Sequence, residues 1–208
     1  MLFRSGFIGS HSVDHLLAEG HEVVGVDSLR TGKLANLARA LAQSAFRFER
    51  MDVRDVAALD DLVRETRPGA ILHLAAMVSV QECLADPALG FSLNLHATHL
   101  VAEAARRHAV PRMVFASSAA VYGDTREFPT AEDAPQRPLG PYGAAKLASE
   151  ALLQGHAEAY GLSVYCLRYF NVYGPRQDAS SPYSGVISAF ESKFRSRNRP
   201  LLHGDGMQ

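Results

Sequence analysis

The stretch that decides the fold lies near the start of the chain, where Gly6-Phe7-Ile8-Gly9 opens a helical segment and Val23-Val24-Gly25-Val26-Asp27 follows. The second run has the apolar, β-branched composition of a buried strand, and it ends in an acid. In dinucleotide-binding folds a glycine turn directs a helix N-terminus at phosphates, and an acid after the next strand binds a ribose hydroxyl. Two glycines are also typical of a plain turn, and Asp27 alone is compatible with a loop cap, so the prediction rests on both features together.

Outward from this stretch, apolar strand-like runs alternate with helical stretches, as in α/β folds with a parallel sheet. This pattern predicts a Rossmann-like, doubly wound parallel sheet in residues 1–170. Beyond Arg176 glycine, proline and serine increase, and we expect residues 171–208 to form the beginning of a smaller substrate-binding region. The expected strands are 23–27, 46–52, 70–76, 112–117 and 163–168, and the expected helices lie near 8–19, 55–66, 92–108 and 142–160.

Both ends of the chain look cut. A dinucleotide-binding fold begins with a strand that feeds into the glycine turn, but little sequence precedes Gly6, and the usual first glycine falls on Phe3. We therefore expect the first strand to be missing, residues 1–5 to be non-native, and the substrate-binding region to be truncated at Gln208. The neighbouring strands would lose ladder partners, at about 1–3 kcal/mol for each unpaired buried group, so we expect low stability and weak cofactor binding.

The composition argues against several classes of function. A formal net charge of −1 over 208 residues gives no reason to expect nucleic acid or an acidic membrane surface as a partner. The 2 cysteines, Cys83 and Cys166, suggest no disulfide framework, which fits a cytoplasmic protein, and no run is apolar and long enough to span a bilayer. The histidines show no metal-ligand spacing, so we expect no metal site, and His73 is expected to be a core histidine in an apolar strand.

The chemistry is concentrated in Pro141-Tyr142-Gly-Ala-Ala-Lys146, which places a phenol and an ammonium one turn apart on one helix face. The ammonium favours the phenolate, which can act as a base near neutral pH. Upstream, the apolar strand that begins at Phe115 opens into hydroxyls, and Ser118 can bind the same substrate oxygen if that strand ends beside the helix. The spacing alone is also typical of a solvated helix face. Two flanking motifs favour the catalytic interpretation: Ser117-Ser-Ala-Ala-Val-Tyr-Gly123 and Leu167-Arg-Tyr-Phe-Asn-Val-Tyr-Gly-Pro-Arg176.

In this order the motifs resemble the extended short-chain dehydrogenase/reductases that act on nucleotide sugars, and most closely the UDP-hexose 4-epimerases such as UDP-glucose 4-epimerase. The resemblance runs from Gly6 to Gly206. It implies NAD as the cofactor, a UDP-hexose as the substrate, and a homodimer formed through the helices near 92–108 and 142–160. An acid at position 27 also repels the extra phosphate of NADP, which favours NAD.

The resemblance also implies which residues form the site. Some of these residues also have a structural interpretation. Asp52 could cap a helix, although Asp55 is better placed for that role, and Ser79 could be a turn hydroxyl. Asn94 and Tyr122 could be structural residues. The expected catalytic residues are Ser118, Tyr142 and Lys146. The expected NAD-binding residues are Gly6, Phe7, Ile8, Gly9, Asp27, Asp52, Val53, Leu74, Ala75, Ala76, Tyr142 and Lys146. The expected substrate-binding residues are Ser79, Ser118, Tyr142, Phe170 and Asn171.

The reaction that the resemblance implies is epimerisation at C4. Tyr142 removes the proton of the C4 hydroxyl while a hydride moves from C4 to NAD, Ser118 holds the oxygen, and the hydride returns to the other face of the 4-keto sugar. Related 4,6-dehydratases carry an Asp-Glu pair where this chain has Ala119-Ala120, which favours an epimerase. The alternatives are another nucleotide-sugar oxidoreductase or dehydratase of the same family, and a non-catalytic NAD-binding module or inactive fragment.

Overall fold

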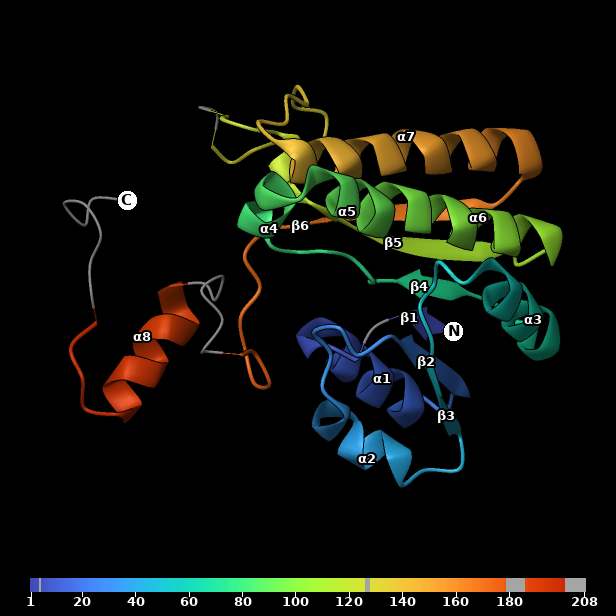
Figure 1. Ribbon diagram of the computed structural model, residues 1–208, viewed down its shortest axis with the longest axis horizontal. Helices are drawn as coiled ribbons and strands as arrows, with labels where there is room; N and C mark the ends of the chain where they lie inside the picture. The colour runs from blue at the N-terminus through green and yellow to red at the C-terminus, as the bar shows by residue number, and fades with distance from the viewer. Residues whose placement is uncertain (4, 126–127, 179–185, 201–208) are drawn as a thin grey trace. The chain divides into compact units, whose positions relative to one another are not determined.

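The computed structural model describes residues 1–3, 5–125, 128–178 and 186–200. The chain divides into two compact units, Met1–Phe170 and Asn171–Gln208. The first unit contains a six-stranded sheet with helices packed on both faces (Figure 1). Within the described residues of the second unit, one helix is present, α8 (Val186–Arg195). The truncation expected at Gln208 concerns residues 201–208, which lie outside the described residues.

The sheet is parallel at every junction, which confirms the predicted doubly wound architecture. Its strand order is β3-β2-β1-β4-β5-β6, so the chain reverses direction across the sheet between β1 and β4. Ligands of such sheets bind beyond the carboxyl ends of the strands at this switch point. The strands are β1 (Leu2–Phe3), β2 (Val23–Asp27), β3 (Phe46–Arg50), β4 (Ile71–His73), β5 (Arg112–Ser118) and β6 (Ser163–Tyr169).

The prediction that the first strand is missing is wrong, because Leu2 and Phe3 form β1 at the centre of the sheet. Leu2 pairs with Gly25 on one side and with Leu72 on the other, so both neighbouring strands keep a partner here. The backbone oxygen of Met1 also accepts a hydrogen bond from the Leu72 N–H at 2.8 Å. A two-residue strand has no alternating pattern to detect, which explains why the sequence did not indicate it. Arg4, which follows it, lies outside the described residues.

The long helices of the first unit lie where the sequence pattern predicts them, and polar caps fix the start of one of them and of two short helices that the pattern did not indicate. Asp55 caps α3 (Val56–Thr66) by accepting a hydrogen bond from the Ala58 N–H, and Ser79 and Asp86 cap α4 and α5 in the same way. The remaining elements are α1 (Phe7–Ala18), η1 (Leu34–Leu37), α2 (Ala38–Leu41), α4 (Val80–Ala85), α5 (Pro87–Phe91), the π-helical turn η2 (Ser92–His96), α6 (Ala97–Arg107), η3 (Ala119–Val121) and α7 (Pro141–Tyr160). Among the described helices, none combines the length and apolar character needed to cross a bilayer.

Two apolar clusters hold the helices on the sheet. One joins β4 and β5 to α3, α6 and α7, with Phe115 and Met113 fully buried at its centre. The other joins β1 and β2 to α1 and α2 around Leu2 and Val13. Because helices cover both faces of the sheet, the carboxyl ends of the strands are where a ligand can reach it.

Candidate functional site

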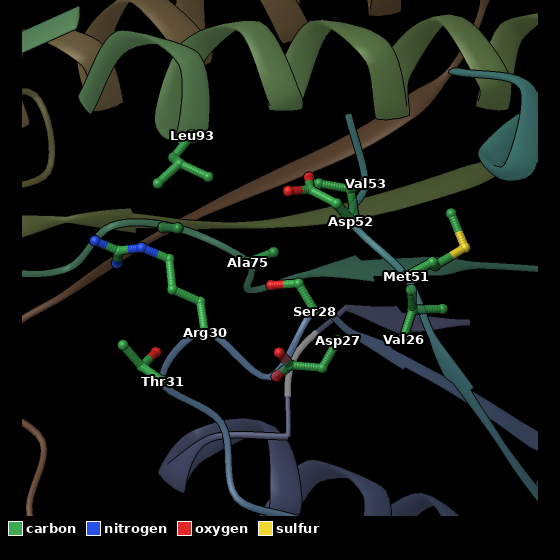
Figure 2. A pocket seen from close by; sticks show the side chains of 11 residues that line it. Val26, Asp27, Ser28, Arg30, Thr31, Met51, Asp52, Val53, Ala75 and Leu93 are labelled. Carbon is green, nitrogen blue, oxygen red and sulfur yellow. The ribbon is translucent and has the colours of Figure 1, made fainter. Parts of the chain in front are cut away.

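A pocket lies beyond the carboxyl ends of β2, β3 and β4, next to the switch point between β1 and β4 (Figure 2). It contains about 510 Å³ of empty space, a volume that includes the open solvent at its mouth. The lining residues are Val26, Asp27, Ser28, Arg30, Thr31, Met51, Asp52, Val53, Ala75, Ala76 and Leu93.

Asp27 ends β2 and organises the loop that follows it. Its Oδ2 accepts hydrogen bonds from the N–H and the hydroxyl of Ser5, at 2.6 and 2.8 Å, and its Oδ1 accepts one from the Leu29 N–H at 2.6 Å. A Cβ added at Gly32 would lie 2.2 Å from Ser5 Oγ, so this position must be glycine for the loop to approach so closely. Asp27 therefore does cap a loop, and with about four acceptor sites its carboxylate retains capacity for a hydroxyl in the pocket.

Asp52 is held by its neighbour Arg54. The guanidinium donates from Nε to Oδ1 at 3.0 Å and from Nη2 to Oδ2 at 2.6 Å, and its Nη1 reaches the hydroxyl of Ser92 at 3.0 Å. These contacts with Arg54 hold the pKa of Asp52 below its ordinary value, so the carboxylate stays charged. Asp55 provides the cap of α3, as expected, and Asp52 is left to face the pocket.

The pocket brings together five of the residues expected to bind the cofactor: Asp27, Asp52, Val53, Ala75 and Ala76. Leu74 is buried in the core against α1, and the turn from Gly6 to Gly9 is not part of the lining, although it opens α1 as expected. Sequence reasoning missed the loop residues Ser28, Arg30 and Thr31. Their position directly after a strand that ends in an acid is the signal that could have identified them. Val26, Met51 and Leu93 were missed as well.

A second group of residues lies where α7 packs on the end of β5. Lys146 is buried, with 2% of its surface exposed, and its ammonium donates a 2.6 Å hydrogen bond to the backbone oxygen of Ala116. The same nitrogen lies 4.6 Å from the ring centroid of Phe115 and 6.0 Å from that of Tyr142. The expected arrangement is present: the phenol and the ammonium share one face of the helix, and that face points to the strand.

Ser118 and Tyr142 lie on segments that pack closely. Ser118 ends β5, and its hydroxyl accepts a 3.2 Å hydrogen bond from the Ala120 N–H, which forms the turn η3. A Cβ added at Gly143, next to Tyr142, would lie 2.6 Å from the backbone oxygen of Ala120. The first turn of α7 therefore rests against the turn that follows Ser118. No carboxylate stands in this turn, because its first two residues are Ala119 and Ala120.

Three further residues, Ser79, Asn94 and Tyr122, make structural contacts, whereas Phe170 and Asn171 are exposed. Ser79 is 3% exposed and accepts from the Glu82 N–H at 2.9 Å as the cap of α4. The amide of Asn94 binds both the N–H and the carbonyl of Met77, at 2.7 and 3.1 Å. Tyr122 is buried, and its hydroxyl donates to the Glu132 carbonyl at 3.2 Å, as the core interpretation predicts. Phe170 is exposed at the end of the first unit, and Asn171 is exposed at the start of the second.

His73 is a core histidine, as predicted. It is fully buried, and its Nε2 is hydrogen-bonded to Thr98 Oγ1 at 3.2 Å. Burial, and to a smaller extent the charge of Lys146, lower its pKa to about 3, so the ring is neutral at physiological pH. Burial likewise raises the pKa of the Cys83 thiol and raises that of Cys166 to about 11, so neither is an activated nucleophile.

Comparison with known proteins places this arrangement in a family. The model of the NAD dependent epimerase/dehydratase family matches residues 4–208. A UDP-glucose 4-epimerase of Mycolicibacterium smegmatis is 40% identical over 203 residues, which cover 97% of this chain and 64% of that protein.

Solved structures give the same result. One is a UDP-N-acetylglucosamine 4-epimerase from Methanobrevibacter ruminantium in complex with UDP-N-acetylmuramic acid. It superposes with a TM-score of 0.93 at 35% sequence identity, and the match covers 100% of this chain and 66% of that protein's chain. A UDP-glucose 4-epimerase from Thermus thermophilus in complex with NAD superposes with a TM-score of 0.86 at 40% identity, over 95% of this chain and 63% of its own. The chain thus spans less than two thirds of the length of these relatives. Its match to the family model and its similarity to these proteins show that it belongs to the NAD dependent epimerase/dehydratase family.

Proposed function

We propose that this chain carries the NAD-binding part and the reactive groups of a UDP-hexose 4-epimerase. The observation that carries the proposal is the buried Lys146 anchored to β5 beside Tyr142, with the hydroxyl of Ser118 at the end of the same strand. A non-catalytic binding module has no need for this set. The names of the relatives supply the substrate class, a UDP-linked hexose.

The pocket fits the adenosine end of NAD. Asp27 and Asp52 offer carboxylate oxygens for ribose and adenine donors, and Ala75 and Ala76 leave room beside them. The carboxylate of Asp27 would repel the 2′-phosphate of NADP, which supports NAD as the cofactor. The free N–H groups at the start of α1, next to Gly6 and Gly9, would face the pyrophosphate. When bound, NAD supplies the acceptor and donor for the hydride of C4.

In this proposal each reactive side chain has one main task. Tyr142 takes the proton of the C4 hydroxyl, and it returns a proton to the oxygen when the 4-keto sugar is reduced on its other face. Ser118 donates a hydrogen bond to the same oxygen and orients it. The positive charge of Lys146 favours the ionised form of Tyr142 and keeps α7 attached to β5 through Ala116. Lys146 would also bind the nicotinamide ribose.

The absence of acid residues at positions 119 and 120 supports an epimerase, because elimination of water from the sugar needs an additional acid and base. Another nucleotide-sugar oxidoreductase or dehydratase of the family is the second candidate. We further propose that Asn171–Gln208 begins a substrate-binding region, with Ser79, Phe170 and Asn171 as substrate contacts. We also propose a homodimer that forms through α6 and α7. A cytoplasmic location is proposed because both cysteines are free thiols.

The test is turnover of UDP-glucose by the protein expressed from its complete gene, with UDP-galactose followed by NMR. Replacing Tyr142 with Phe removes only the hydroxyl, so we expect kcat to fall by about 10²–10⁴-fold, the usual contribution of a positioned base. Tyr160→Phe, in the same helix but exposed, is the matched control and should leave kcat unchanged.

Three outcomes separate the alternatives. No product despite NAD binding would indicate another nucleotide sugar or a reductase. No NAD binding would show that the interpretation of the pocket is wrong. Full activity in Tyr142→Phe would remove the proposed base.

A further inference from the structure

Behind the reactive groups lies a cluster of three polar residues from three elements, Ser117, Glu150 and Arg168. Ser117 on β5 and Arg168 on β6 are direct partners in the register of the two strands, and Glu150 reaches both from α7. The Ser117 hydroxyl donates to Glu150 Oε1, and the Arg168 guanidinium binds the carboxylate through two nitrogens, with 2.7 Å between Nη2 and Oε2.

The cluster continues into the segment that follows Ser118. Arg168 Nη1 donates to the hydroxyl of Tyr122 at 2.8 Å and to the backbone oxygen of Glu132 at 2.7 Å. The guanidinium also lies 4.9 Å from the centroid of the Tyr122 ring. One side chain therefore connects β6, α7 and the segment beyond η3, all within the first unit.

Stability alone does not explain this pair. The side chains of Glu150 and Arg168 are 11 and 20% exposed, so both charges have been largely removed from water. Ion pairs of this kind are often replaced by apolar residues at no loss of stability, because desolvation offsets the attraction. What such a pair does provide is fixed geometry, since a carboxylate and a guanidinium meet in one plane through paired hydrogen bonds.

We propose that Glu150 and Arg168 are positioning residues that set the alignment of Ser118 with Tyr142. The inference rests on the proposed function, because it concerns the same reactive groups. Glu150 follows Lys146 by one helical turn, on the same face of α7. The helix is thus attached to two consecutive residues of β5, Ala116 through Lys146 and Ser117 through Glu150, and Ser118 is the next residue along the strand.

The experiment uses Glu150→Gln, Arg168→Met and the double variant. Each single variant leaves one buried charge without its partner, so we expect a lower Tm. The double variant removes both charges and keeps an acceptor for Ser117, so its Tm should return towards that of the wild type. If the pair positions the reactive groups, kcat of the double variant stays about 10²-fold below that of the wild type, because misplacement by about 1 Å has an effect of that size. KM and the Kd of NAD should change little. Recovery of kcat together with Tm would overturn the proposal.

A second readout does not depend on turnover. In protein labelled with ¹³C at the tyrosine ring, the Tyr142 resonance is assigned by its loss in Tyr142→Phe. We expect it to shift in the double variant and to stay in place in Glu65→Gln, which breaks the exposed ion pair with Arg47 at the opposite side of the sheet. An unshifted Tyr142 resonance in the double variant would overturn the positioning role of Glu150 and Arg168, whether or not the wild type is active. A wild type that turns over no UDP-hexose would instead refute the proposed function.

Discussion

At the scale of single residues, the site is supported by ionisable groups that the fold has removed from water. His73 and Lys146 both lie near the buried ring of Phe115, with a distance of 5.8 Å between the His73 and Phe115 ring centroids. The lysine makes a charge-assisted hydrogen bond to Ala116, whereas the histidine stays neutral beside Thr98. A neutral imidazole is compatible with the buried ammonium, and a second positive charge at this place would not be.

This arrangement predicts a loss of stability in mild acid. The pKa of His73 is about 3 in the folded chain, far below its ordinary value of 6.5, so only the unfolded chain binds the proton as pH falls from 6.5 towards 3. Stability present above pH 6.5 is therefore lost over this window, by up to about 1.4 kcal/mol per pH unit from this residue. Urea unfolding at pH 7.5, 6.0 and 5.0 measures the slope. His73→Asn should flatten it, and His21→Asn, which is exposed, should not. Equal slopes in the wild type and His73→Asn would contradict the assignment.

At the scale of elements, the N-terminal turn of α7 sets the distance between the two reactive segments. Gly143 and Gly155 lie in the same helix but in different surroundings. A Cβ at Gly143 would meet the Ala120 oxygen at 2.6 Å and the Cβ of Pro138 at 3.0 Å, whereas a Cβ at Gly155 would meet nothing within 4 Å. Neither glycine has a positive φ, so the difference between them is one of space.

Alanine substitutions at these two glycines should therefore have different effects. Gly143→Ala forces the first turn of α7 away from η3, so we expect a drop in kcat of about 10–10²-fold from the displacement of Tyr142. Gly155→Ala should leave kcat unchanged and raise stability by about 0.5–1 kcal/mol, because alanine is the better helix residue. Epimerase assays and thermal melts of both variants check this. Equal activity in the two would show that the contact with Ala120 does not set the alignment.

Most elements could be predicted because their signals are local. Alternation, apolar runs and caps such as Asp55 indicated five strands and the four long helices of the first unit to within a few residues. The short helices α2, α4 and α5 and the helix α8 were not predicted. Two further features had no local signal: β1 is too short to show a period, and the π-helical turn at 92–96 has the same apolar spacing as an α-helix. The same limit applies to the site. Asp27 and Tyr142 belong to recognisable motifs, whereas Glu150 and Arg168 acquire their meaning only when the sheet brings their segments together.

At the scale of the whole first unit, β1 joins two halves of the sheet that would otherwise be separate. It pairs with β2, which leads to Asp27, and with β4, which leads to Ala75 and Ala76, and all three residues line the pocket. The pocket therefore depends on a strand of two residues. The expected loss of ladder partners is partly avoided, and Leu2 also ties β1 to the apolar cluster beneath it.

Leu2 tests this dependence. Its side chain is fully buried in the cluster with Val13 and Leu37, so Leu2→Ala in the 208-residue chain should lower the free energy of unfolding by about 2–5 kcal/mol. Urea unfolding should show a lower midpoint with an unchanged m-value, because the folded structure buries the same surface. Leu41→Ala, at an exposed position on α2 nearby, is the control and should change the midpoint little. If the two variants unfold alike, β1 is not held by the core, and the two halves of the sheet are joined by other contacts.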